Sequence, residues 1–248
     1  MSAHPQDGSS GRPAGAGPFL AQILIDLKSP DPTARTAEEA VRTLLAFGDR
    51  LVDLRRRDFF ELVLAPPGSG ASMAGSPEAS MAGSSGASPA RSSAEPDSLP
   101  NLLRRYLETT AVLWNSNKQR AWLRVPWDSG EAGSLEVIPG RTPREGGFGS
   151  PGLEDGAYDH ILVWSRARRP APADLAAALG PWSIMAEGSC ELYSLAWRKG
   201  ATGEERRTWT EAVATARSRG SGLLVNPHSQ DHRLLFGMVP IPFWSGSG

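Results

Sequence analysis

The stretch SGLLVNPHSQDHRLLFGMVPIPFW, residues 221–244, is the most apolar run of the chain and holds two of its four histidines. Its two apolar arms, GLLVN at 222–226 and RLLFGMV at 233–239, flank an Asn-Pro step of the kind that starts turns. The stretch therefore predicts a core β-hairpin with His228 and His232 in or beside its turn. Pro240 and Pro242 would then prevent further ladder pairing.

A helix is predicted directly before this hairpin, over residues 203–219. Thr202 and Glu205 form a capping box at its start, and Gly220 supplies a stop at its end. Its apolar residues recur with helical spacing, which assigns one face of the helix to the core. They are Trp209, Ala212, Val213 and Ala216.

Between residue 98 and this helix, the pattern predicts more strands than helices. Helices are expected over residues 99–107 and 172–179. Strands are expected over residues 109–114, 120–125, 134–138, 159–165, 182–187 and 190–198, with Gly188-Ser189 as a hairpin turn. This order predicts an α+β fold, with a mixed, mostly antiparallel sheet and two or three helices packed on one face.

The composition divides the chain into four parts. Residues 1–17 and the Gly/Ser/Ala/Pro linker 66–97, in which ASMAGS occurs twice, are expected to be disordered. Residues 18–65 are expected to form a small N-terminal helical element with a short strand, which docks on the main domain or hangs free. Its helix would start at Asp31 and Pro32 and end at the arginines of residues 55–57, before a strand at 59–65. The main α+β domain is expected at residues 98–246.

Charge and cysteine content exclude several classes of protein. The 26 basic and 27 acidic residues give a net charge of -1, which makes nucleic acid an unlikely partner. The one cysteine, Cys190, excludes an intrachain disulfide and a cysteine-rich metal site. The first 17 residues lack the apolar h-region of a signal peptide, and no run approaches the 18 apolar residues of a membrane span, so we expect a cytoplasmic protein that needs no membrane.

The leading functional hypothesis is a non-catalytic bacterial protein that binds another protein, as an adaptor, chaperone or immunity-type partner does. On the strand 120–125, Arg120, Trp122 and Arg124 alternate with apolar residues and would share one face. If exposed, such an arginine–tryptophan face suits protein binding. This hypothesis needs no cofactor. A structural component of a larger assembly is a further possibility.

The rival hypothesis is a metal-dependent hydrolase or nuclease. His160, His228, Asp231 and His232 lie at or beside predicted strand ends, together with Asp159. Imidazole and carboxylate groups could jointly hold Zn²⁺ or another divalent ion if the fold brought them together. In the simpler interpretation, His228 and His232 are solvated residues of a polar turn.

Three other sequence patterns do not predict a functional site. The glycines of GFGSPG, at 147–152, lack the preceding strand and following helix of a dinucleotide site. Cys190 after Gly188-Ser189 indicates a structural thiol at a strand start. The predicted helix 203–219 followed by GLLVNPHS resembles the end of the N-terminal domain of the bacterial serine-sensitivity-enhancing family over these few residues, and nothing is carried over from that family.

Overall fold

The computed structural model describes residues 19–45, 47–67, 98–125, 136–138, 157–167, 172–218 and 221–236. The predictions for the tail 1–17, for the linker after residue 67, for the loop 147–152 and for the prolines after residue 236 lie outside these ranges. None of the helices described is long and apolar enough to cross a membrane.

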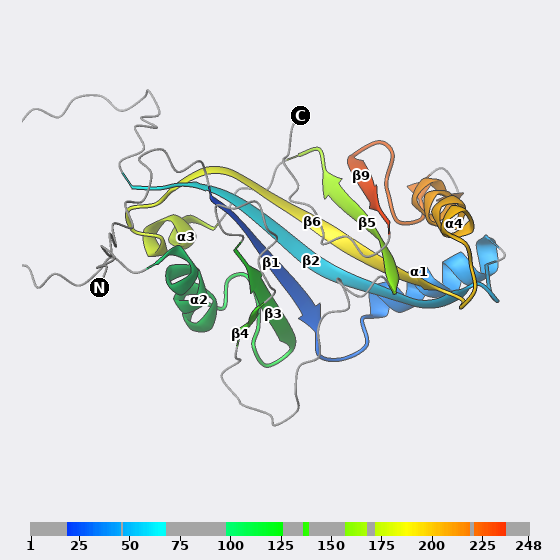
Figure 1. The fold of residues 1–248 in the computed structure, drawn as a ribbon, viewed down its shortest axis with the longest axis horizontal. Helices are drawn as coiled ribbons and strands as arrows, with labels where there is room; N and C mark the ends of the chain where they lie inside the picture. The colour runs from blue at the N-terminus through cyan, green and yellow to red at the C-terminus, as the bar shows by residue number, and fades with distance from the viewer. Residues whose placement is uncertain are drawn as a thin grey trace, which may run out of the picture.

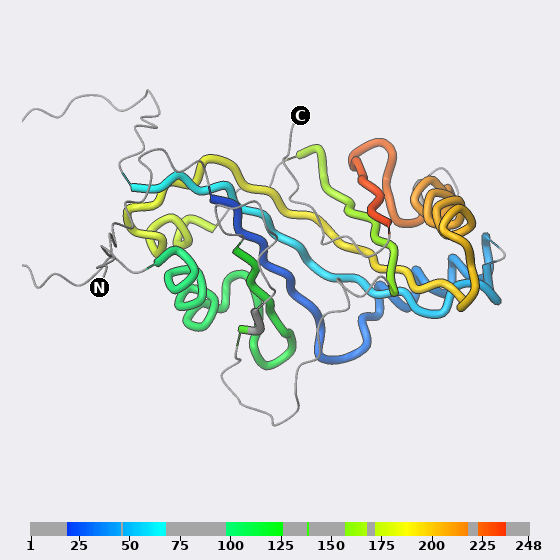
Figure 2. The backbone as a smooth tube through the Cα atoms, in the orientation of Figure 1, coloured from blue at the N-terminus to red at the C-terminus, as the bar shows by residue number. Residues whose placement is uncertain are grey.

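Two long strands run antiparallel through the middle of the molecule (Figures 1 and 2). They are β2 (Leu51–Ala65) and β6 (Ser183–Trp197), with 15 residues each. Within the described ranges the sheet has seven strands in the order β4-β3-β1-β2-β6-β5-β9, and every pair is antiparallel. The other strands of this sheet are β1 (Phe19–Leu27), β3 (Gln119–Arg124), β4 (Glu136–Ile138), β5 (Tyr158–Ser165) and β9 (Gln230–Leu235).

The part of the chain that the structure describes also contains four helices, which complete the α+β fold predicted from the sequence. They are α1 (Pro32–Leu44), α2 (Leu99–Thr109), α3 (Ala173–Ala178) and α4 (Gly203–Thr215). The predicted start of α1 is confirmed, because the Asp31 side chain accepts a hydrogen bond from Thr33 N at 2.8 Å. The capping box of Thr202 and Glu205 at the start of α4 is confirmed too.

The two long strands correct two predictions. Helix α1 ends at Leu44, and the arginines of residues 55–57 lie inside β2 instead of closing a helix. Residues Gly188 and Ser189 do not form a turn, because they pair with Glu61 and Phe60 in the middle of the β2–β6 ladder. A partner strand of equal length pairs with nearly all of β6, and this long-range pairing outweighs the local turn signal.

The strand predicted over residues 109–114 and the hairpin predicted around Asn226 are also wrong. Residues 110–118 form bends and turns before β3, not a strand. Residues 221–222 form β8 (Ser221–Gly222), which pairs with β7 (Arg217–Ser218), whereas β9 pairs with β5. The described parts of the two apolar arms, residues 222–226 and 233–236, therefore do not pair with each other.

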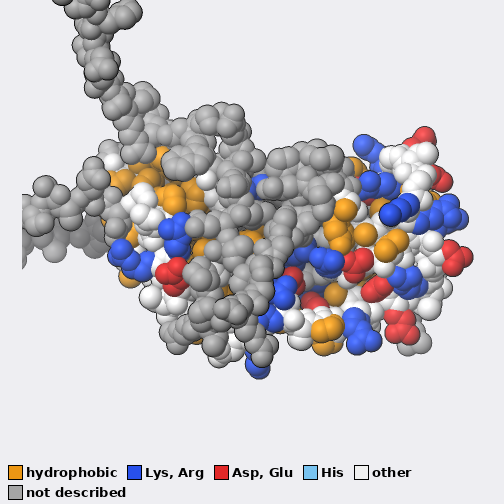
Figure 3. Space-filling view, turned by 60° about the horizontal axis from the view of Figure 1, so that its bottom comes forward, with side chains coloured by type: hydrophobic (Ala, Val, Ile, Leu, Met, Phe, Trp, Pro, Cys, Tyr) orange, Lys and Arg blue, Asp and Glu red, His pale blue; other side chains and the backbone are white. Residues whose placement is uncertain are grey.

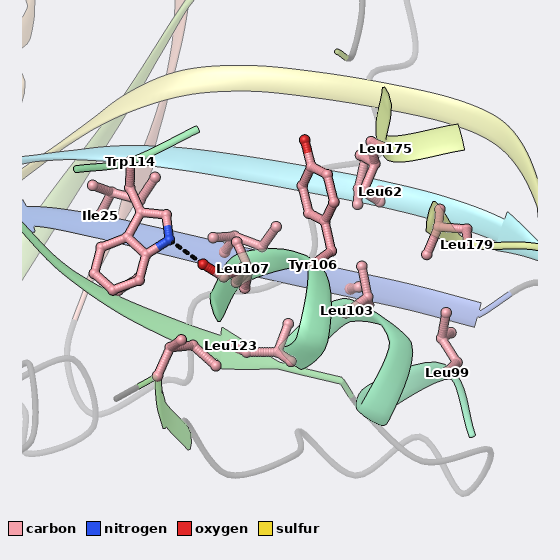
Figure 4. Packing of buried hydrophobic residues seen from close by; sticks show 14 of the residues in the cluster. Ile25, Leu62, Leu99, Leu103, Tyr106, Leu107, Trp114, Leu123, Leu175 and Leu179 are labelled. Atoms are coloured by element: carbon pink, nitrogen blue, oxygen red, sulfur yellow. Dashed lines mark hydrogen bonds between the residues drawn. The ribbon is translucent and has the colours of Figure 1, made fainter. Parts of the chain in front are cut away.

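The helices pack on one face of the sheet, here called the helical face, and form two separate cores. In the first core, α2 and α3 cover β1 and β3 (Figure 4), where the Trp114 indole donates a hydrogen bond to Leu107 O at 2.7 Å. In the second, α1 and α4 cover β5 and one end of β6, with Trp197 and Trp209 in edge contact. The two helix pairs lie toward opposite ends of the long strands (Figure 1).

The order of the elements shows an internal duplication. The series β1-α1-β2-α2-β3 is followed by β5-α3-β6-α4-β9, with the same pairing inside each half. The turns before β3 and β9 have the same hydrogen bonds: Asn115 N donates to Gln119 Oε1 at 2.6 Å, and Asn226 N to Gln230 Oε1 at 2.7 Å. We infer that the two halves are related by a pseudo-twofold axis.

The strand register places this axis. Asp58 pairs directly with Glu191, and the flanking pairs Phe59–Cys190 and Arg57–Leu192 exchange across that point. The axis therefore passes between Asp58 and Glu191, perpendicular to the sheet. Register in the outer strands agrees, since Ile23 of β1 pairs with Phe60 and Ile161 of β5 pairs with Tyr193.

The duplication corrects the predicted division of the chain. Strands β1 and β2 were expected in a separate N-terminal element, but they lie in the middle of the sheet, between β3 and β6. Residues 19–65 and the strands and helices after residue 98 therefore build one common fold. Each helix pair combines one helix from each half.

We expect the chain shortened to residues 98–248 to lose cooperative folding. Without β1 and β2, strands β3 and β4 lose their connection to β6, and each core loses part of its strand floor. Circular dichroism during heating measures this, with the full chain as control. A sharp thermal transition in the shortened chain would restore the original division.

Candidate functional site

The predicted arginine–tryptophan surface is not exposed. Trp122 is 3% and Arg124 is 2% exposed, whereas Arg120 is half-buried. Trp122 packs with its cross-strand neighbour Leu24 and with Phe59, on the face of the sheet opposite the helices. The expectation of an exposed contact surface at Arg120, Trp122 and Arg124 is wrong on this point.

The opposite face carries buried polar bridges between strands. Gln22 Nε2 donates to Glu61 Oε2 at 3.2 Å, and Arg124 Nε donates to Gln22 Oε1 at 2.9 Å. At the position that the pseudo-twofold axis relates to Gln22 and Glu61, His160 Nδ1 lies 2.9 Å from Ser194 Oγ. Buried polar groups that are paired in this way fix the strand register.

The distance between Ser194 and His160 is that of a nucleophile and its base, but the pair is not accessible to a substrate. Arg57 Nη1 donates to Ser194 Oγ at 3.1 Å, and the same oxygen is hydrogen-bonded to His160 Nδ1. Ser194 is 0% and His160 is 1% exposed, and both lie beneath the surface of the opposite face. A substrate could not reach this serine, and the pair acts as a buried bridge.

The residues proposed for a metal site do not converge. His160 of β5 pairs with Leu235 of β9, and His232 of β9 pairs with Val163 of β5. The two imidazoles therefore lie at different levels of this strand pair and on opposite faces of the sheet. Asp231 forms an ion pair with Arg166 at 2.9 Å, and His228 is exposed in the turn before β9. Among the residues described, no three His, Cys, Asp or Glu side chains could hold one ion. The expected convergence is therefore wrong.

A groove lies on the helical face, at the junction of the two halves. It has a volume of about 560 Å³ and is lined by residues of both halves. Its floor is the middle of β2 and β6: Arg56, Asp58, Phe60, Glu187, Ser189 and Glu191. Its apolar wall comes from Val112 and Leu113 after α2 and from Pro172 and Leu175 at α3; Trp164, Ser165 and Gln230 lie at its other end. We call this the central groove.

One arginine binds three carboxylates at the floor of the central groove. Arg56 Nη2 contacts both Asp58 Oδ1, at 3.2 Å, and Glu191 Oε1. Arg56 Nε donates to Glu191 at 3.1 Å, and Nη1 lies 3.5 Å from Asp31 Oδ2. Asp31 also caps α1, so this network ties the helix start to the centre of the sheet.

The network sets the ionisation of its members. Burial by itself would lower the pKa of Arg56, but the hydrogen bond to Glu191 and the charges of Glu191 and Asp58 raise it above its usual value. Tyr193 donates to Glu191 Oε2 at 2.9 Å, and burial together with that carboxylate raises the pKa of Tyr193. Arg56 and Tyr193 therefore stay protonated throughout the physiological range and act as fixed hydrogen-bond donors.

Cys190 touches the groove but is no nucleophile there. Cys190 packs with Phe59, Leu192 and Trp122 in the apolar cluster on the face of the sheet opposite the helices. Burial, and then the charges of Glu61, Glu191 and Asp58, raise the pKa of its thiol well above the usual value. The thiol is therefore protonated at neutral pH, in agreement with the structural role predicted for it.

On the face visible in Figure 3, charged side chains of one sign do not gather into a single patch. At the end of the molecule with α1 and α4, basic and acidic side chains are intermixed. Part of this mixture is held in ion pairs, such as Arg42–Glu38 at 2.7 Å. A basic stripe of the kind that tracks a phosphate backbone does not occur on this visible end.

We expect Arg56→Gln to lower the free energy of unfolding by about 1–2 kcal/mol, because the neighbouring carboxylates Asp58 and Glu191 would lose the cation that contacts both of them. Urea unfolding followed by circular dichroism measures the change. Arg55→Gln is the matched control: Arg55 is more exposed and pairs with Asp53 on the surface. Equal losses in the two variants would contradict the role assigned to Arg56.

We expect iodoacetamide at pH 8 to modify Cys190 in the native protein at least about 100-fold more slowly than in guanidinium, since both burial and a raised thiol pKa oppose the reactive thiolate. Mass spectrometry of timed samples gives both rates. A native rate close to that of the unfolded chain would show that this thiol is accessible and ionised.

Comparison of the chain with protein-family models, with curated proteins and with solved structures gave no match. The chemistry of the central groove is therefore the ground on which a function is argued. The groups that form it, chiefly Arg56, Asp58 and Glu191, were assigned from the sequence to the end of a helix or to no site.

Proposed function

We propose that this chain is a non-catalytic protein-interaction module, of the adaptor, chaperone or immunity type, and that its central groove holds a segment of another protein. The proposal keeps the class expected from the sequence. It moves the contact surface from Arg120, Trp122 and Arg124 to the helical face. The observation that carries it is the groove of about 560 Å³ at the junction of the two halves.

The lining of the groove suits binding. Binding sites commonly combine apolar walls with a few fixed polar groups in a concave space of roughly 300–1,000 Å³. Here the wall residues Val112 and Leu113 supply apolar contact, and the network of Arg56 with Asp58 and Glu191 supplies oriented charge. Because the strands β2 and β6 hold Arg56, Asp58 and Glu191 in place, little side-chain entropy of these three residues is lost when a partner binds.

The charged groups of the groove support recognition more than chemistry. The Arg56 guanidinium contacts three carboxylates, and Tyr193 donates a hydrogen bond to one of these, Glu191. Groups engaged with each other in this way present a fixed pattern of charge to a ligand. The expected bacterial origin and cytoplasmic location belong to the same proposal.

We expect a photo-crosslinking amino acid in place of Val112 to capture a partner polypeptide in extracts of the source organism. Val112 is 61% exposed at the groove wall. The matched control is the same substitution at Val52, which is 60% exposed but does not line the groove. Gel electrophoresis and mass spectrometry identify the products. The same polypeptides at both positions, or none at Val112, would contradict the proposal.

A further inference from the structure

We propose that the outer edge of β9 binds β9 of a second copy of this chain, so that two copies pair through an antiparallel ladder centred on His232. This inference goes beyond the proposed function, because it concerns the edge of the sheet and not the central groove. It follows from the position of β9, from the internal duplication and from the two opposite charges that β9 presents.

Strand β9 forms one edge of the sheet within the described ranges. It lies beside β5 at the end of the strand order (Figure 1), and the ladder described for it is with β5. Every second residue of β9 therefore directs its backbone N–H and C=O groups away from β5. None of the six residues of β9 makes a polar contact with a residue outside the described ranges. An edge of this kind is a template for pairing with another strand.

The internal duplication allows β9 to be compared with β3 residue by residue. The turns before the two strands share the contact of an asparagine N–H with a glutamine side chain, and they share a second hydrogen bond. Asn117 N donates to Asn115 Oδ1, and His228 N donates to Asn226 Oδ1, each at 3.0 Å. Each strand begins four residues after its asparagine, so the two strands have the same start.

The comparison shows that a strand fits beside β9. Residues 121–123 of β3 pair with β4 on the side away from β1. They correspond to residues 232–234 of β9, whose outer side has no partner strand within the described ranges. The fold can therefore accept a further strand at this edge, in the same way as it accepts β4 beside β3.

The charges of β9 favour one register for two identical strands. Residues that face each other in an antiparallel ladder must direct their backbone groups in the same way, so a symmetric pair centres on a residue and not between two residues. Centres at His232 and at Arg233 each use five of the six residues of β9. The centre at Arg233 sets two arginines opposite each other, which is unfavourable. The centre at His232 sets Asp231 opposite the partner's Arg233, twice by symmetry.

Both charged groups are accessible for this pairing. Asp231 and Arg233 lie two positions apart on the strand, so their side chains share one face of the sheet. The Asp231 side chain is 47% exposed and contacts Arg166 at 2.9 Å. Arg233 is exposed and makes no ion pair within the described part of the chain. The partner's Arg233 would therefore give Asp231 a second cation without breaking an existing ion pair of Arg233.

The other residues of β9 also suit pairing. Edge strands that are protected from pairing commonly carry lysine or proline, and neither occurs in the sequence QDHRLL of β9. Leu234 and Leu235 are half-buried, each against a different apolar cluster. A strand added beside them would remove more of their apolar surface from water, which favours association.

The symmetry of this pairing has a consequence for the central groove. The twofold axis of an antiparallel strand pair is perpendicular to the sheet, because residues opposite each other project from the same face. The seven strands of each copy would continue into one sheet, and both helical faces would lie on the same side. Two central grooves would then open in the same direction. This consequence rests on the proposed function, whereas the dimer itself does not.

Sedimentation velocity of the full chain over a range of concentrations tests the pairing, and we expect a monomer–dimer equilibrium. Arg233→Asp would set two carboxylates opposite each other and should weaken dimerisation at least about tenfold. The exchange Asp231→Arg/Arg233→Asp restores opposite charges and should return the affinity to within about threefold of the original. Arg35→Asp is the matched control, since it makes the same change at an exposed position on α1. Thermal unfolding confirms that all variants are folded.

A cysteine on the proposed axis gives a second measurement. In the register proposed, residue 232 faces its own copy with Cβ atoms about 4.5–5.5 Å apart. We expect His232→Cys to form a disulfide-linked dimer under mild oxidation, as shown by non-reducing gel electrophoresis. Glu39→Cys, at an exposed position of α1, is the matched control and should stay monomeric. Cys190 is present in both variants, so it does not distinguish them.

Several results would overturn the inference. One is a monomer at concentrations up to about 1 mM, which would leave the edge of β9 to a different segment, from this chain or from another protein. Others are a dimer that Arg233→Asp does not weaken, an exchange of charges that does not restore association, or equal crosslinking of His232→Cys and Glu39→Cys. These substitutions leave the floor and the apolar wall of the central groove unchanged. The crosslink at Val112 therefore tests the proposed function independently.

Discussion

The pairing of β2 with β6 is the constraint on which the rest of this structure depends. Each strand is 15 residues long, and nearly every residue of one has a partner in the other. This ladder joins the two halves of the chain into one sheet. It also sets the distance between the helix pairs, because each pair packs near one end of the long strands. The central groove is the space that this arrangement leaves over the middle of the ladder.

Local signals in the sequence predicted the helices better than the strands. The capping residues Asp31 and Thr202 marked two helix starts correctly, because caps act within one turn of the chain. Gly188-Ser189 indicated a turn that does not exist, since a distant strand satisfies their backbone groups. The α+β class could be predicted from the number of strands, but the position of β1 and β2 in the centre of the sheet could not.

The groove could not be predicted because its parts are far apart in sequence and lack a motif. Arg56 stood in a run of three arginines that resembled the end of a helix, and its partners Asp31 and Glu191 are brought to it only by the fold. A comparison of the chain with itself would have helped more. Gln-Ile-Leu-Ile at 22–25 and His-Ile-Leu-Val at 160–163 occupy equivalent strand positions, as do the turns that begin at Asn115 and Asn226.

The internal duplication has a consequence for the direction of any bound segment. Exchange across the axis relates Arg56 to Ser189, because Arg56 pairs with Tyr193 and Phe60 pairs with Ser189. Two identical halves would place an arginine on each side of the axis and balance both carboxylates, so a ligand could lie either way round. In the single chain, one half has the arginine and the other has a serine. The two ends of the groove therefore differ in charge, and a partner segment would be held in one orientation.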